Sequence, residues 1–89
     1  MKAVVTVIGK DAVGITAKIS AVCAKHGANI VDITQKVLED LFVMIMITEV
    51  DGLDVKFTDF VDEMVRTGKE SDLEIHVMHE DIFNAMHTI

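Results

Sequence analysis

The segment GKDAVGIT, residues 9–16, has the spacing in this chain that most resembles a ligand-binding loop. Gly9 and Gly14 stand where an apolar run gives way to a helical pattern, and ligands often bind at such strand-to-helix turns. The spacing G-x-x-x-x-G, with Thr16 after it, is part of the phosphate-loop motif G-x-x-x-x-G-K-[ST]. Position 15 is Ile15 where that motif needs lysine. The segment therefore argues against a nucleotide phosphate site.

Gly14 still needs an explanation. We expect a helix to begin here with Asp11 as its N-cap, a contact that contributes about 0.5–2 kcal/mol. A glycine in the first helical turn costs roughly 0.5–1 kcal/mol relative to alanine, so stability does not account for Gly14. Without a Cβ, a ligand can lie against the backbone, where free N–H groups favour a carboxylate. A small amino acid or organic acid fits this geometry better than a nucleotide.

The remaining reactive side chains do not form a catalytic or metal-binding pattern. The single cysteine, Cys23, falls on the apolar face of the predicted helix and has no basic neighbour in sequence, so we expect a packed thiol. His76 and His79 would face opposite sides of a strand. The expectation is no catalytic residue, no metal site and no cofactor, and hence a protein that is not an enzyme. The histidines are His26, His76, His79 and His87.

Composition narrows the class of protein. The chain has 89 residues, 51% of them hydrophobic, which is enough to form the core of one small domain. Its net charge of -7 disfavours nucleic acid and anionic membranes as partners. The longest apolar run, LFVMIMI, is far shorter than the roughly 20 residues of a membrane helix. We expect a soluble, cytoplasmic protein, with no membrane and no nucleic acid as partners.

The first half of the chain predicts strand, helix and strand. Residues 2–8 are β-branched and apolar, as in a central strand. Apolar residues then recur at helical spacing from Ala12 to His26, and Gly27 should end the helix. The stretch ANIVDITQKVL alternates, which places Val31, Ile33 and Val37 on one face of a second strand.

The second half repeats the order. LFVMIMITEV is apolar on both faces, so it predicts a buried strand. Asp54 is placed to cap a second helix, which Gly68 should end, and LEIHVMH alternates as a fourth strand from Leu73. The final ten residues, EDIFNAMHTI, predict a short amphipathic helical tail.

This order, βαββαβ, predicts the α+β ferredoxin-like fold, with a four-stranded antiparallel sheet and both helices on one face. Right-handed crossovers place the first and third strands side by side in the middle. Those two strands are the most apolar, which favours the same topology.

The apolar content of the third strand also predicts an uncovered surface. One of its two faces should meet water in a one-sided sheet, and a tail folded over it or a second subunit would cover it. We favour an oligomer. The residues expected on this methionine-rich face are Phe42, Met44, Met46, Met78, Phe83 and Met86.

At this point the residues resemble a known family. The pattern GKDAVGITAKISAVCAKHGANIVDITQ, with GANI opening the second strand, is similar to an ACT domain, the small regulatory module that binds amino acids. The likeness covers residues 1–89 as one ACT-like domain. Length and the tail, from HEDIF to MHTI, are similar to small free-standing ACT-domain proteins, and more distantly to the regulator of the glycine cleavage system.

The resemblance implies a ligand site shared between two subunits. In the family, the ligand lies where the first loop of one domain meets the second strand of a neighbour in a side-by-side dimer. The residues that this places at the ligand are Asp11, Ala12, Val13, Gly14, Ile15 and Asn29. Val13 stands where the family often has proline, which leaves the identity of the ligand open.

Two functions therefore remain at this stage. The first is a non-catalytic regulatory module that binds an amino acid at a homodimer interface, or in a higher homo-oligomer, and acts on a regulated protein partner. The alternative is a ligand-free protein-protein interaction module that uses the methionine-rich sheet face.

Overall fold

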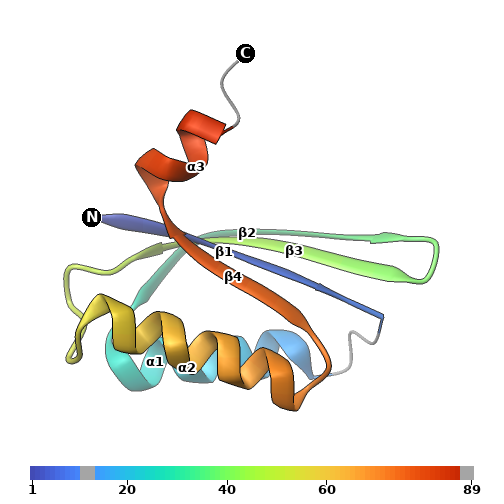
Figure 1. Ribbon diagram of the computed structural model, residues 1–89, viewed down its shortest axis with the longest axis horizontal. Helices are drawn as coiled ribbons and strands as arrows, with labels where there is room; N and C mark the ends of the chain where they lie inside the picture. The colour runs from blue at the N-terminus through green and yellow to red at the C-terminus, as the bar shows by residue number, and fades with distance from the viewer. Residues whose placement is uncertain (11–13, 87–89) are drawn as a thin grey trace.

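The computed structural model describes residues 1–10 and 14–86. Figure 1 shows a sheet with two helices packed beneath it and a third helix on the opposite side. This confirms the predicted βαββαβ order with a C-terminal helix. The elements are β1 (Lys2–Gly9), α1 (Ile15–His26), β2 (Asn29–Leu38), β3 (Leu41–Glu49), α2 (Phe57–Glu70), β4 (Glu74–His79) and α3 (Glu80–Met86).

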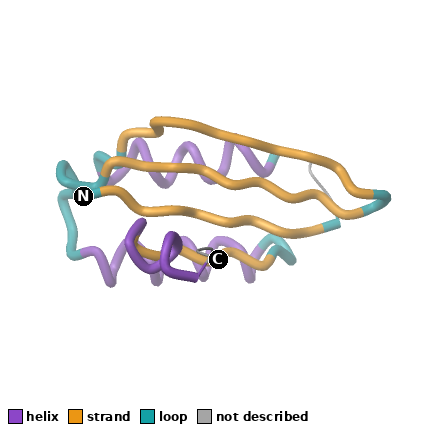
Figure 2. Tube along the Cα trace, turned by 90° about the horizontal axis from the view of Figure 1, so that it is seen from above, coloured by secondary structure: helices purple, strands orange, loops and turns teal. Residues whose placement is uncertain are grey.

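The sheet has the order β2-β3-β1-β4, and every neighbouring pair is antiparallel. The two most apolar strands, β1 and β3, are central, as predicted, and β2 and β4 form the edges. Figure 2 shows the four strands side by side, with α1 and α2 behind them and α3 in front. The edge strand β2 is thus free to pair with another chain.

The core lies between the sheet and the helices α1 and α2, and here the prediction for β3 was wrong. Phe42, Met44 and Met46 point into this core and are buried. Met44 pairs with Val7 and Met46 with Val5, which are the inward residues of β1. Both faces of this strand are apolar, so periodicity shows which side chains share a face. It does not show which of the two faces packs against the helices. The methionine-rich docking face therefore loses three of its members.

Part of the opposite face is covered by the C-terminal helix. Helix α3 packs against β1 and β4, and Val4, on that face of β1, is only 2% exposed. Beside the helix a hollow of about 430 Å³ remains, which is bordered by Ile45 and Met78 among others. Helix α3 thus packs over its own sheet, although sequence analysis favoured a second subunit as the cover for this face.

Strand β2 departs from its predicted alternation. A register shift between Ile30 and Asp32 marks a β-bulge in its pairing with β3. Ile30 and Ile33 both pack against the core as a result. Val31, predicted to share a face with Ile33, is instead 51% exposed.

The predicted helix caps were wrong, although the elements themselves were right. Asp11 lies outside the described residues, and α1 begins at Ile15 with Gly14 as its N-cap. Helix α2 has Lys56 at its N-cap, and Asp54 instead contacts the ring of His26.

Of the two predicted helix ends, one is confirmed and the other is wrong. Gly27 ends α1, as predicted, with a φ of 80° that suits glycine. Gly68, predicted to end α2, lies buried inside that helix, which continues to Glu70. A Cβ on Gly68 would meet the carbonyl oxygen of Leu73 at 2.9 Å, so this glycine serves close packing.

Candidate functional site

Gly14 begins α1 in a left-handed conformation, with φ 73° and ψ 0°. This explains the glycine and corrects the expectation that it lies within the first helical turn, because left-handed backbone is costly for other residues. Apart from its chain neighbours, none of the described residues has an atom within 4 Å of where a Cβ would stand on Gly14. In the described part of the chain, no side chain caps this helix end and no acidic residue stands in the first turn. Among the described residues, then, no side chain occupies the first N–H groups of α1, which are the groups that a ligand acceptor would meet.

The other predicted contact, Asn29, lies at the far end of the same helix. Helix α1 has 12 residues, which corresponds to about 18 Å. Asn29 follows its C-terminus and starts β2. One chain therefore does not bring Gly14 and Asn29 together. Ile15 is 3% exposed in the core, so its side chain does not face the loop, and Asp11, Ala12 and Val13 lie outside the described residues.

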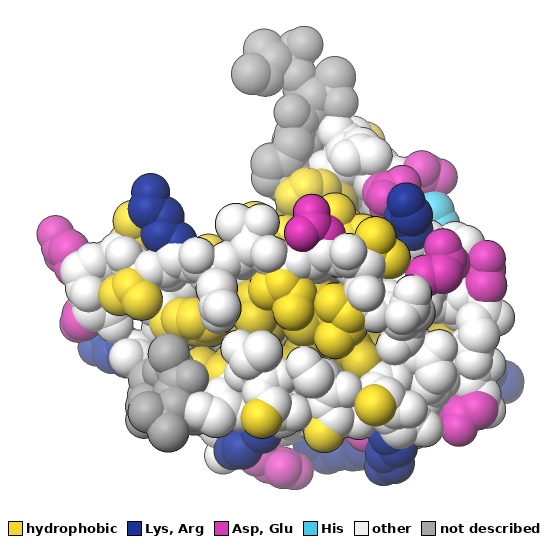
Figure 3. All heavy atoms as spheres, turned by 180° about the vertical axis from the view of Figure 1, so that it is seen from behind, with side chains coloured by type: hydrophobic (Ala, Val, Ile, Leu, Met, Phe, Trp, Pro, Cys, Tyr) yellow, Lys and Arg dark blue, Asp and Glu magenta, His cyan; other side chains and the backbone are white. Residues whose placement is uncertain are grey.

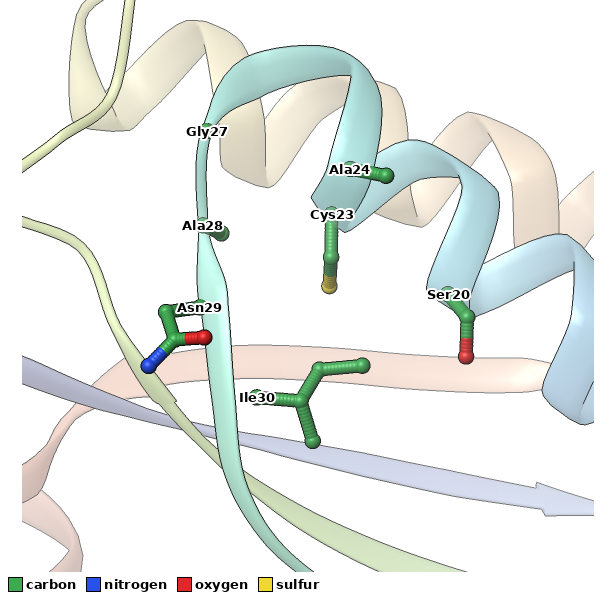
Figure 4. A pocket seen from close by; sticks show the side chains of 7 residues that line it. All are labelled: Ser20, Cys23, Ala24, Gly27, Ala28, Asn29 and Ile30. Atoms are coloured by element: carbon green, nitrogen blue, oxygen red, sulfur yellow. The ribbon is translucent and has the colours of Figure 1, made fainter.

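A shallow hollow of about 550 Å³ lies between the second half of α1 and the start of β2. Figure 4 shows Ser20, Cys23 and Ile30 directed into the space between helix and strand, and the amide of Asn29 on the other side of the strand. The floor is thus apolar, and the polar groups lie at its margin. The residues around it are Ser20, Cys23, Ala24, Gly27, Ala28, Asn29 and Ile30.

The free edge of β2 continues this surface. Figure 3 shows hydrophobic side chains gathered across the middle of the face on the β2 side. Val31 and Val37 are 51% and 63% exposed on the edge strand, and Leu38 is exposed beyond them. Ile30 and Ile33 are only partly buried. An edge strand with apolar side chains is the kind of surface that pairs with another strand.

Cys23 is a packed thiol, as predicted. It is buried, its Sγ lies 4.0 Å from Sδ of Met46, and burial raises the pKa of the thiol from its usual 9.0 to about 11. The thiolate, which is the nucleophilic form, is therefore scarce at neutral pH.

Native Cys23 should resist alkylation. At about pH 8 the raised pKa reduces the thiolate fraction roughly a hundredfold, and burial slows access further. We expect iodoacetamide to modify the native protein at least about 100-fold more slowly than the urea-unfolded chain, followed by intact mass spectrometry. Similar rates for the two states would show that the thiol is accessible and activated.

His26 is the residue that sequence reasoning missed. Its ring is buried between two carboxylates, with Nδ1 3.0 Å from Asp54 and Nε2 2.8 Å from Glu63. These hydrogen bonds, that to Glu63 first, raise the pKa of His26 above its usual 6.5. The partners stand 28 and 37 residues away in sequence, so no local pattern reveals them.

The other histidines are more exposed. His76 and His79 lie on opposite faces of β4, as predicted, with His76 Nε2 3.3 Å from Glu74 and His79 Nδ1 accepting the Asp81 N–H at 3.1 Å. Within residues 1–10 and 14–86 no group of three or more His, Cys, Asp or Glu is placed to hold a metal ion. Over the same residues no helix is long and apolar enough to cross a membrane.

Comparisons with known proteins agree with this architecture. The family model of the ACT domain matches residues 2–78. A UPF0237 protein of Methanopyrus kandleri is 47% identical over 88 residues, which cover 99% of this chain and 98% of that protein. The match thus extends through the C-terminal helix that follows the four strands.

Solved structures give the same result. An ACT domain protein from Streptococcus pneumoniae superposes with a TM-score of 0.82 at 35% identity and covers 100% of this chain and 97% of its own. A glycine cleavage system repressor has a TM-score of 0.70 at 20% identity over 89% of this chain and 47% of its own, a likeness of fold. The family model, together with the full-length matches to the Methanopyrus kandleri and Streptococcus pneumoniae proteins, shows that the chain belongs to the ACT domain family.

Proposed function

We propose that this protein is a non-catalytic regulatory module that binds an amino acid between two copies of itself. ACT domains are regulatory modules that bind small ligands. The observation that carries the proposal is the separation of Gly14 and Asn29 by the length of α1. A site that uses both Gly14 and Asn29 needs a second chain, and that chain could pair with the exposed edge of β2.

Antiparallel pairing of two β2 strands would bring the two ends together. Thr16 Oγ1, at the start of α1, lies 3.9 Å from Sδ of Met44, which pairs with Gln35 of β2. The helix thus begins above the middle of the strand and ends beside Asn29. In a two-fold pairing near Ile33, Asn29 of the partner subunit comes alongside the later half of β2, the part that lies nearest the start of α1. Symmetry then creates two equal sites.

The chemistry of the two ends suits an amino acid. The open N–H groups at the start of α1 favour a carboxylate, and Gly14 leaves room for it. In this proposal Asp11, Ala12 and Val13 complete the loop. The amide of Asn29 can donate to a carboxylate and accept from an ammonium group. The single cysteine, with its raised pKa, supplies no nucleophile, which supports a binding role over a catalytic one.

Thermal denaturation against the common amino acids tests the proposal. A ligand at about one hundred times its Kd stabilises the native state by about 2.7 kcal/mol. For a domain of this size that raises Tm by roughly 10–20 °C. We expect at least one amino acid to give such a shift, and no shift across the set would contradict the proposal.

A substitution at Asn29 locates the site. In Asn29→Asp a carboxylate faces the carboxylate of the ligand, so the shift should be lost. Asn84→Asp makes the same change on α3, away from both ends of α1, and should keep the shift. Equal responses of the two variants would remove Asn29 from the site.

A further inference from the structure

The ring of His26 joins three segments of the chain. It stands in the last turn of α1, and its nitrogens contact Asp54, which precedes α2, and Glu63 within α2. The side chain is 10% exposed, and Glu63 is 17% exposed. The ring also packs edge-on against Phe60, with centroids 6.4 Å apart. The imidazole is therefore held on both nitrogens and on one edge.

These contacts require a charged ring. An ionised carboxylate only accepts hydrogen bonds, whereas a neutral imidazole has one donor and one acceptor. With carboxylate oxygens at 3.0 Å and 2.8 Å, both nitrogens of His26 must donate. The other charged groups at this cluster are Lys25 of α1 and Arg66 of α2, which lie 3.5 Å and 4.0 Å from Glu63.

The backbone beside His26 forms the margin of the hollow. The N–H of Asp54 donates to the carbonyl of His26 at 3.0 Å, and the N–H of Ala28 donates to the carbonyl of Cys23 at 2.9 Å. Gly27, between them, lies so close to Gly52 that a Cβ would meet its carbonyl oxygen at 2.5 Å. Asn29 follows directly. These contacts join the backbone of His26, and the segment before α2, to the turn of residues 27–29.

We propose that His26 is a positioning residue: its imidazolium, held between Glu63 and Asp54, fixes the turn of residues 27–29 at the margin of the hollow, and loss of its proton loosens that turn. One nitrogen would then face a carboxylate without a hydrogen between them. The consequence for a ligand rests on the proposed function, whereas the effect on the turn does not.

The direction of the pH dependence follows from two pKa changes. The hydrogen bonds to Glu63 and Asp54 raise the pKa of His26 above 6.5, so its contribution is complete below 6.5 and is lost as the pH rises through the raised value. The hydrogen bond from His26 lowers the pKa of Glu63 below 4.5, so that contribution is present above 4.5 and is lost as the pH falls through the lowered value. The turn is held most firmly between these limits.

Amide hydrogen exchange of the protein without ligand tests the proposal. The readouts are the N–H groups of Ala28 and Asp54, whose acceptors are the carbonyls of Cys23 and His26. The two measurements are made at about pH 6 and about pH 9, on either side of histidine titration. We expect the protection factors to be about tenfold or more lower at the higher pH, because one hydrogen bond to a charged group is lost. Equal protection at the two pH values would overturn the proposal.

Substitutions show whether His26 or another titrating group causes the change in protection. His26→Gln should abolish the pH dependence, while His76→Gln, which removes a 57% exposed imidazole paired with Glu74, should retain it. If His26→Gln fails to fold, Asp54→Asn keeps the bond to Glu63 and should move the fall in protection to lower pH. An unchanged midpoint, or a pH dependence that survives in His26→Gln, would overturn the proposal. Failure here leaves the amino-acid thermal shift untouched, and the reverse also holds.

Discussion

Replacing Gly27 with alanine is expected to lower the free energy of unfolding by about 2–5 kcal/mol. Its φ of 80° is left-handed, which costs a residue with a Cβ about 1–2 kcal/mol. The added Cβ would also stand 2.5 Å from the carbonyl oxygen of Gly52, a backbone atom that cannot rotate away. The resulting shift of the backbone adds about 1–3 kcal/mol. Urea denaturation followed by circular dichroism measures the change.

Gly14→Ala provides the matched control. Gly14 is also left-handed, with φ 73°, but apart from its chain neighbours none of the described residues lies within 4 Å of where its Cβ would stand. Only the conformational cost of about 1–2 kcal/mol applies, and asparagine, which tolerates this conformation, should cost less. If Gly14→Ala proved as destabilising as Gly27→Ala, the close approach to Gly52 would not be the cause.

The predicted parts of the fold are those that depend on local periodicity and on chain connectivity. The helical spacing from Ala12 to His26 and the stop at Gly27 follow from neighbouring residues, so the helix was identified and its end was right. The central position of the two apolar strands follows from the handedness of the crossovers and is confirmed by the sheet order.

The errors arose where contacts between distant residues decide the outcome. The inward face of β3 is set by its pairing with β1, where Met44 lies opposite Val7. The bulge at Val31 depends on the register with β3. Gly14 was identified as unusual, but its reason, a left-handed backbone, cannot be inferred from residue spacing.

For the candidate site, sequence analysis names residues but does not give their arrangement in space. Gly14 and Asn29 follow from the family pattern, and the structure places them at opposite ends of α1. The His26 cluster joins residues 28 and 37 positions apart, so its chemistry depends entirely on the fold. Sequence therefore indicates the loop, whereas the proposal of a site shared with a second chain comes from the distance between the two ends of α1.

Lysine at Val31 and Val37 together is expected to convert a dimer to a monomer. Both side chains are more than half exposed on the free edge of β2, so the fold of one chain should lose no more than about 0.5 kcal/mol. Charged lysines on an edge strand block pairing with another strand. Sedimentation equilibrium at micromolar concentration should give twice 9.8 kDa for the wild type and 9.8 kDa for the variant.

Met86→Lys distinguishes this interface from the opposite face of the sheet. Met86 is 65% exposed on α3 and borders the hollow beside that helix. With pairing through β2, this variant stays dimeric and keeps its response to amino acids, whereas the double lysine variant loses both the dimer and the response. If Met86→Lys alone dissociated the protein, subunits would associate through the α3 face, and Gly14 could not meet Asn29 of a partner subunit. A wild-type mass of 9.8 kDa with and without amino acids would remove the shared site altogether.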